Sequence, residues 1–132
     1  MALNSAGGVV FVSCGQVTEQ ERRLGDGVCG LIRELTPHDP YFADRQSSLE
    51  GLTKNILGAL DRAIGMIAIM HPRGTVTFND ATGLKEQTRA SVWIEQEIAI
   101  AAYMTQVLKQ PINVAAFIHT DIWREGMRDR CF

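Results

Sequence analysis

Three short apolar runs, each ending in polar or turn-forming residues, constrain the fold of this chain most. They are GVVFVSC at 8–14, GMIAIM at 65–70 and INVAAFIH at 112–119. Runs of this length without polar alternation are typical of strands that are covered on both faces, as in a parallel sheet between helices. A shorter run, YFA at 41–43, is a fourth candidate strand. We therefore expect these segments to form one buried parallel sheet.

Residues with helical spacing follow the first run. Thr18 and Glu21 are placed as a capping box at the start of this helix, and Pro37 ends it. Three glycines within the segment weaken its helical propensity. The apolar residues expected on the inner face of this helix are Leu24, Val28, Leu31, Ile32 and Leu35.

Two further helices are predicted between the later strands. Ser47 and Glu50 form a second capping box, and a third helix extends over 91–108, before Pro111. Alternation of strands and helices at this spacing predicts right-handed crossovers and helices on both faces of the sheet. The inner face of the second helix is expected to comprise Leu49, Leu52, Ile56, Leu60 and Ala63.

The polar connection over 71–90 is long for a compact domain, and such connections are usually functional or mobile. Within it, TVTF at 75–78 alternates and is expected to pair briefly with itself or with a sheet edge. Four strands leave two open edges. We expect a fifth strand to come from a longer parent chain or to be missing altogether.

Length and composition describe one domain over residues 1–132. A net charge of −2 gives no basic surface for nucleic acid. The sequence contains neither a signal peptide pattern nor an apolar stretch long enough to cross a membrane, so a cytoplasmic protein is expected. Its three cysteines, Cys14, Cys29 and Cys131, are widely separated and match neither a disulfide framework nor a zinc motif.

Ligands of open parallel sheets bind beyond the carboxyl ends of the strands. The third helix begins on this rim, because each helix leaves from the carboxyl end of the preceding strand, and it carries Trp93 and Glu97 one turn apart. The residues expected just past the strand ends are Ser13, Cys14, Gly15, Asp44, Arg45, His71, His119, Thr120 and Asp121.

The pair Trp93 and Glu97 places an apolar wall beside an acid on one helical face. Such a wall desolvates the acid and raises its pKa. A fixed carboxylate suits cleavage of an N-glycosidic bond, because positive charge develops on the ribose while an aromatic ring holds a flat base. The simpler interpretation, a core tryptophan and a solvated glutamate, stays open on spacing alone.

The pattern S-x-W-x-x-x-E, here Ser91, Trp93 and Glu97, resembles the motif that opens the third major helix of TIR (Toll/interleukin-1 receptor) domains. VFVSC at 10–14 is similar to the first TIR strand, and YFADRQSSLEGLTKNILGAL to the second strand, BB loop and second helix. IGMIAIMHPRG is similar to the third strand and its loop, so the resemblance covers roughly residues 8–119. It implies a flavodoxin-like, three-layer α/β sandwich with a central parallel sheet of four to five strands.

The resemblance also implies an activity. Glu97 would be the catalytic carboxylate of an NAD+ hydrolase or cyclase, with NAD+ as substrate and no cofactor. Such domains usually act as bacterial immune-defence effectors, activated when a fused or separate sensor drives oligomerisation. The substrate-binding residues would be Ser13, Cys14, Gly15, Phe42, Asp44, Arg45, His71 and Trp93.

Two departures from the TIR pattern bear on these roles. Many TIR domains carry basic residues just after the first-strand serine, where this chain has Cys14 and Gly15, so Arg45 or Arg73 is the candidate substitute. The chain also ends before the last strand and helix usual in the family.

Other interpretations stay open. The resemblance is compatible with a non-catalytic TIR-type interaction module, and the chemistry with a nucleoside deoxyribosyltransferase-like enzyme. Cys14 is a weak candidate nucleophile, and His71 with His119 a weak metal site lacking a third ligand. Glu95 competes with Glu97 but lies about 200° away around the helix.

The helix segment 98–104, IAIAAYM, is apolar on nearly every face. Either it is deeply buried, or it contacts another subunit. TIR-like domains commonly assemble, so homo-oligomerisation through the BB-loop region and the 91–108 helix is expected.

Overall fold

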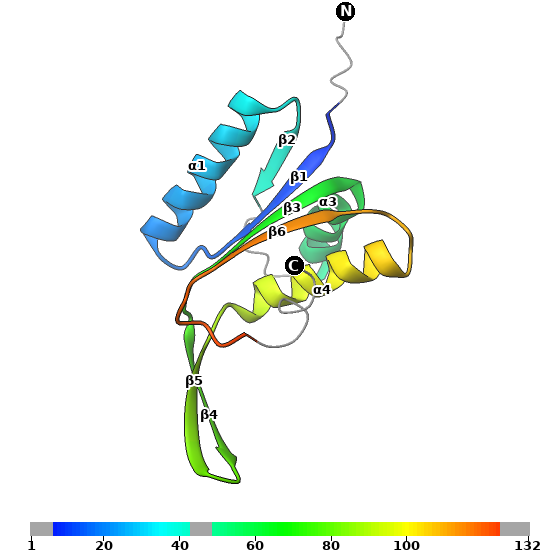
Figure 1. Ribbon diagram of the computed structural model, residues 1–132. Coiled ribbons are helices and arrows are strands. Elements are labelled where there is room, and N and C mark those ends of the chain that lie inside the picture. Colours follow the sequence, from blue (N-terminus) through cyan, green and yellow to red (C-terminus); the bar gives the residue numbers. More distant parts are fainter. Residues whose placement is uncertain (1–6, 43–48, 125–132) are drawn as a thin grey trace, which may run out of the picture.

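The computed structural model describes residues 7–42 and 49–124 of this 132-residue chain. Strands and helices alternate along most of it, and a hairpin extends from one end (Figure 1). The elements are β1 (Val9–Cys14), α1 (Glu19–Leu35), β2 (Asp39–Phe42), α2 (Leu49–Gly51), the π-helical segment η1 (Leu52–Leu57), α3 (Gly58–Arg62), β3 (Ala63–Met70), β4 (Gly74–Asp80), β5 (Gly83–Arg89), α4 (Val92–Gln106) and β6 (Asn113–Ile118).

Four strands form one parallel sheet in the order β2-β1-β3-β6. The prediction of a parallel sheet is therefore confirmed. β1 and β3 are its central strands, and they pair from Val9 opposite Ala63 to Cys14 opposite Ile69. Their carboxyl ends consequently lie side by side at one rim.

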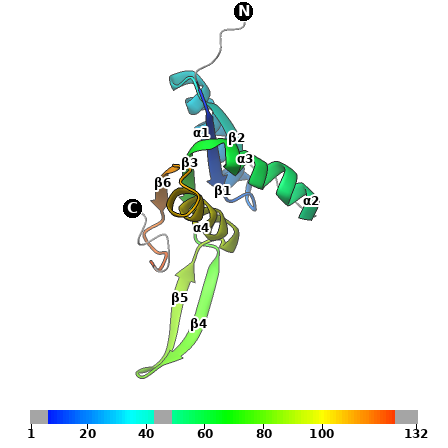
Figure 2. The ribbon, with the colours of Figure 1, turned by 90° about the vertical axis from the view of Figure 1, so that its right-hand side faces the viewer.

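Helices pack on both faces of this sheet (Figures 1 and 2). On one face, Cys29 and Ile32 of α1 pack against Val12 of β1. On the other face, α3 and α4 enclose the larger core, which contains Phe11 and Met66. Side chains alternate along a strand, so successive residues of β1 belong to different layers. None of the helices in the described part of the chain is long and apolar enough to span a membrane.

The predicted inner face of α1 is largely wrong. Leu24, Leu31 and Leu35 are 42%, 54% and 72% exposed. α1 packs through its smaller residues instead, because the helix approaches Phe42 so closely that a Cβ on Gly25 would lie 2.0 Å from the Phe42 ring. The buried positions of α1 are Glu21, Gly25, Cys29 and Ile32.

The second helix is formed by α2, η1 and α3 in succession. Ile56, Leu60 and Ala63 are buried, as predicted. Ser47, the predicted N-cap, lies outside the described residues, and so do the side chains of Leu49 and Leu52.

The connection over 71–90 is mostly an antiparallel hairpin, which the sequence suggested only through TVTF. Thr75 to Phe78 pair with Thr88 to Lys85 across the hairpin. Its two strands extend away from the body of the molecule (Figure 2). At its tip, the Thr82 amide donates to Asp80 Oδ1 at 2.7 Å, and Gly83 takes a positive φ of 118°.

β6 was predicted as a strand buried on both faces, and this is wrong. It lies at an edge of the sheet, with Asn113, Ala115 and Phe117 exposed on one face. Only Val114, Ala116 and Ile118 pack against the core.

Candidate functional site

Glu97 and Ser13 meet where the carboxyl end of β1 faces α4. The Glu97 side chain points inward from the second turn of α4, and the residue is 3% exposed. The Ser13 hydroxyl, itself buried, donates a hydrogen bond to Glu97 Oε2. Glutamate side chains are almost never fully buried without a partner. Here the sheet supplies that partner through Ser13.

Trp93 lies one helical turn before Glu97 and is 41% exposed. Both residues border a cavity of about 400 Å³ between η1 and α4. Its walls are almost entirely apolar, and the volume is within the range of small-molecule sites. The lining residues are Ile56, Leu57, Trp93, Gln96, Glu97, Ala99 and Ile100.

Burial raises the pKa of the Glu97 carboxyl from 4.5 to about 7. Loss of hydration penalises the charged form, whereas hydrogen bonds from Ser13 and Trp93 stabilise that form and limit the rise. The raised pKa therefore keeps more of this carboxyl group protonated at neutral pH than is usual for a glutamate. A perturbed carboxyl group beside a cavity is a common feature of functional sites.

Cys14 follows Ser13 but points to the opposite face of the sheet. Its thiol donates to the Glu21 carbonyl at 3.6 Å, on the α1 side. Burial, together with the negative charge of Glu21, raises the pKa of this thiol to about 11. A thiol that stays protonated at neutral pH is a poor nucleophile, so nothing in this geometry favours nucleophilic catalysis by Cys14.

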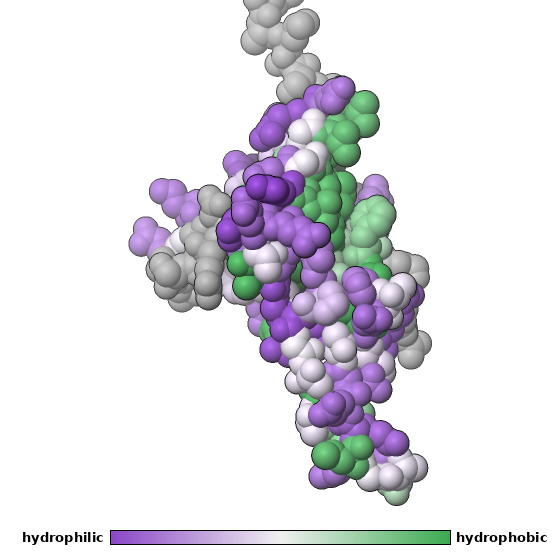
Figure 3. All heavy atoms as spheres, turned by 90° about the vertical axis from the view of Figure 1, so that its left-hand side faces the viewer, coloured by the Kyte–Doolittle hydropathy of each residue, from purple (hydrophilic) through white to green (hydrophobic). Residues whose placement is uncertain are grey.

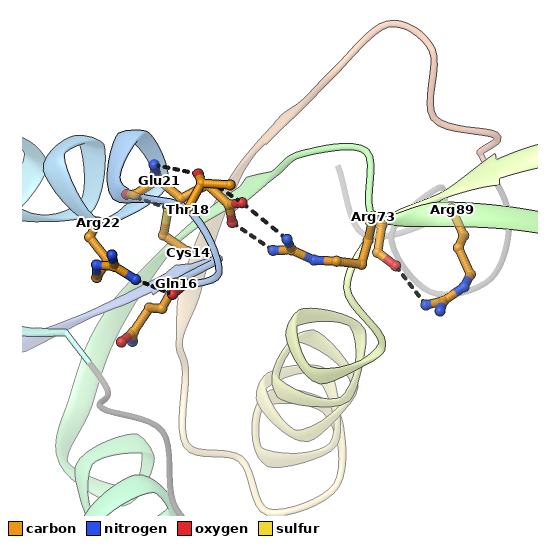
Figure 4. A network of polar contacts seen from close by, with 8 residues as sticks. Cys14, Gln16, Thr18, Glu21, Arg22, Arg73 and Arg89 are labelled. Carbon is orange, nitrogen blue, oxygen red and sulfur yellow. Dashed lines mark hydrogen bonds and ion pairs between the residues drawn. The ribbon is translucent and has the colours of Figure 1, made fainter.

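Glu21 and Arg73 form a partly buried ion pair (Figure 4). The two guanidinium nitrogens donate to the two carboxylate oxygens at 3.0 and 2.6 Å. A Cβ on Gly15 would lie 1.7 Å from Glu21 Oε2, so the pair lies directly against the β1–α1 turn. The guanidinium that was a candidate for phosphate binding is thus engaged by an internal carboxylate.

Thr18 caps α1 and also holds Glu21. Its hydroxyl oxygen accepts from the Glu21 amide at 3.1 Å, which confirms the predicted cap, and its hydroxyl approaches Glu21 Oε1 at 3.2 Å. These contacts and Arg73 hold the pKa of the Glu21 carboxyl below its usual value, with the Arg73 hydrogen bond as the largest cause. Glu21 therefore remains an anion.

The two rim histidines are differently placed. His71 follows β3, and its Nδ1 is buried without a hydrogen-bond partner among the described residues. His119 is exposed, and its Nδ1 accepts from the Asp121 amide at 3.1 Å. In residues 7–42 and 49–124, no three His, Cys, Asp or Glu side chains are arranged to hold a metal ion.

The remaining predicted residues do not all gather at the cavity. Phe42 packs with Val12 in the α1 layer, away from Glu97. Asp44 and Arg45 lie outside the described residues. Glu95, the competing acid, is not among the cavity-lining residues. The structure thus brings together Ser13, Trp93 and Glu97 and places Cys14 and Phe42 on the other face of the sheet.

The cavity includes residues that sequence reasoning assigned no functional role, namely Ile56, Leu57 and Gln96. The signal that could have identified Gln96 in the sequence was its position directly before Glu97.

Comparison of the chain with protein-family models, with curated proteins and with solved structures gives no match.

Proposed function

We propose that this protein is a TIR-type NAD+ hydrolase or cyclase that cleaves the bond between nicotinamide and ribose. The observation that carries the proposal is the buried Glu97 carboxyl group, bonded to Ser13 at the carboxyl end of β1 and bordering an apolar cavity beside Trp93. The proposal includes a cytoplasmic role in bacterial immune defence, with activity switched on by oligomerisation.

The proposed reaction uses Glu97 as a counter-charge. When the C–N bond breaks, its electron pair moves onto the pyridinium ring, which leaves as neutral nicotinamide, and positive charge develops on the ribose. An ionised carboxylate in a water-poor site stabilises that charge more strongly than it would in water. Water then adds to the ribose and loses a proton to solvent, or a nucleophile within the ADP-ribose unit closes a ring.

The cavity fits the leaving group. Nicotinamide is a flat ring, and a cavity with mostly apolar walls, bordered by an indole, suits such a ring. Ser13 would keep the Glu97 carboxylate oriented toward the ribose, because its hydroxyl bonds one of the two carboxylate oxygens. Glu97 would be the catalytic residue and Ser13 a positioning residue.

The strand order supports a flavodoxin-like fold. The parallel strands, numbered in sequence among themselves, have the order 2-1-3-4, which is the first part of the 2-1-3-4-5 order of flavodoxin-like sheets. In that architecture ligands bind at the point where strand order reverses, next to the first strand. Ser13 is the next-to-last residue of the first strand.

The decisive experiment measures nicotinamide release from NAD+ by concentrated protein, followed by chromatography. We expect the wild type to release nicotinamide and Glu97→Gln, which keeps the shape but removes the charge, to lose at least about a hundredfold in rate. Glu95→Gln is the matched control on the same helix and should retain most activity. Equal rates for the wild type and Glu97→Gln would refute the role of Glu97.

The two alternatives give different outcomes in the same samples. A non-catalytic TIR-type interaction module would assemble, as light scattering would detect, without turning over NAD+. A nucleoside deoxyribosyltransferase-like enzyme would exchange bases between deoxynucleosides and leave NAD+ intact.

A further inference from the structure

In the part of the chain that the structure describes, β6 is an edge strand of the sheet. It pairs with β3 on one side, and no strand among residues 7–42 and 49–124 pairs with its other side. Natural edge strands are usually protected by lysine, proline, a bulge or a covering segment. The strand sequence NVAAFI contains neither a charged residue nor a proline, and its pairing with β3 continues without a bulge. Its outer row of backbone groups is therefore suited to pairing with another strand.

One face of β6 is open as well. Asn113, Ala115 and Phe117 point to the α1 side of the sheet, where α1 packs on β1 and β2. Phe117 is 62% exposed. On this side of the molecule, a band of hydrophobic surface lies next to hydrophilic surface (Figure 3). The opposite face, with Val114, Ala116 and Ile118, is packed against the core.

We propose that two copies of this chain associate through their β6 strands, antiparallel and related by a two-fold axis at Ala116. The two four-stranded sheets would then join into one sheet of eight strands. In this register Phe117 lies opposite Ala115 of the partner subunit, and Val114 lies opposite Ile118 of the partner subunit. Each large side chain on the open face thus meets a small one.

The distribution of charged residues favours a second copy of this chain as the pairing partner of β6. A strand without charged side chains can pair with an identical strand without like-charge repulsion. In the antiparallel arrangement, the start of one β6 lies near the end of the other. Exposed Lys109 precedes β6, and exposed Asp121 follows it. The charged residues nearest to the two strands are therefore of opposite sign at each end of the interface.

The interface would be small. A short strand ladder and two phenylalanines bury less than the roughly 800 Å² per partner of a standard interface, so we expect a dissociation constant of about micromolar order. Sedimentation equilibrium should show a monomer–dimer equilibrium for the wild type. A wild type that is monomeric at every concentration up to about 300 µM, some hundredfold above such a constant, would overturn the proposal.

Two variants locate the interface. Phe117→Lys and Ala115→Lys put a charge on the open face of the edge strand, and each should weaken dimerisation at least tenfold. Leu35→Lys is the matched control, because Leu35 is a 72% exposed apolar residue on α1, and it should dimerise like the wild type. Thermal unfolding by circular dichroism checks that all three variants fold. Dimers of unchanged affinity in both β6 variants would contradict the assignment.

Mixing two variants tests the register. Positions 115 and 117 lie opposite each other in the proposed pairing. An equimolar mixture of A115K and F117E should therefore form heterodimers that are tighter than the weakened homodimer of either variant. A mixture that associates no more tightly than either variant alone would exclude this register. NAD+ cleavage plays no part in these measurements, so the β6 dimer and the proposed enzymatic function stand or fall separately.

Discussion

Ser13, the next-to-last residue of β1, donates its hydroxyl hydrogen to Glu97 on α4, 84 positions later in the chain. The contact crosses from the central sheet to the helix that covers it, so it fixes the rotamer of a carboxyl group inside the core. Burial and this hydrogen bond act in opposite directions on the Glu97 pKa. The balance between them determines how much of the carboxylate is present at neutral pH.

Removing the hydroxyl should shift the titration of Glu97 upward. In Ser13→Ala the carboxylate loses the largest interaction that lowers its pKa, while the desolvation that raises the pKa remains. We expect the Glu97 pKa to move above its value of about 7. Carbon-detected NMR of the labelled side-chain carboxyl against pH would measure it. Ser91→Ala is the control, because Ser91 makes no side-chain cap bond to α4, and a pKa unchanged in Ser13→Ala would show that the hydroxyl does not stabilise the ion.

Replacing Glu97 by glutamine should change how stability depends on pH. The folded-state pKa of Glu97 is raised from 4.5 to about 7, so between these values the folded wild type binds a proton that the unfolded chain has released. The contribution of Glu97 to the free energy of unfolding therefore falls as pH rises through this window and is level above it. The rise in pKa corresponds to about 3 kcal/mol.

Urea denaturation of Glu97→Gln and wild type at pH 4, 6 and 8 would test this expectation. The stability of the variant relative to the wild type should increase by about 3 kcal/mol from the lowest to the highest pH. Glu34→Gln, at an exposed position of α1, should follow the wild-type profile. A constant difference between Glu97→Gln and wild type across this range would mean that the carboxyl group titrates normally.

The central strands could be predicted because their residues are apolar toward both layers. Phe11 and Val12 of β1 belong to different cores, and both are fully buried. Phe117 gave the same signal in the sequence, yet it is exposed at the sheet edge. A hydrophobic sequence indicates that a strand face is suited to burial. It does not indicate whether another element of the same chain packs on that face. For this reason, the sequence could not predict which strands are central and which lie at an edge.

The acidic residue of the candidate site, Glu97, could be predicted from the sequence, but the residues around it could be predicted only in part. The four-residue spacing of Trp93 and Glu97 survives in α4, because a regular helix keeps such residues on one side. The period of two along a strand separates Ser13 from Cys14, so only one of them can face Glu97. At the cavity wall, Ile56 lies on the predicted inner face of its helix, but the adjoining Leu57 was not predicted there. A regular α-helix was assumed for this segment, whereas η1 is π-helical.

Breaking the ion pair between Glu21 and Arg73 should be costly. Arg73→Met keeps much of the side-chain volume but leaves a carboxylate whose side chain is 6% exposed without its main partner. We expect a loss of about 2–3 kcal/mol at pH 7, less than for a fully buried pair because the Arg73 side chain is 21% exposed. The pair lowers the folded-state pKa of Glu21, so its contribution is present at neutral pH and declines as pH falls through that lowered pKa.

Equilibrium unfolding at pH 7 and pH 3 would measure this difference, which should be smaller at the lower pH. Arg23→Met is the control, since Arg23 and Glu19 form a pair at 2.8 Å with side chains 78% and 71% exposed. It should stay within about 0.5 kcal/mol of the wild type. Equal losses for Arg73→Met and Arg23→Met would mean that burial adds nothing to the Glu21–Arg73 pair.

Two glycines in α1 should respond in opposite directions to the same substitution. At Gly25 the new Cβ would lie 2.0 Å from the Phe42 ring, so α1 must move away from β2, and we expect Gly25→Ala to destabilise the fold by about 1–3 kcal/mol. At Gly27 nothing lies within 4 Å of such a Cβ. Gly27→Ala should therefore stabilise the helix by up to about 1 kcal/mol, because alanine loses less backbone entropy. Thermal and urea unfolding of both variants would reveal the sign, and a stabilising Gly25→Ala would show that α1 does not pack on β2 through this face.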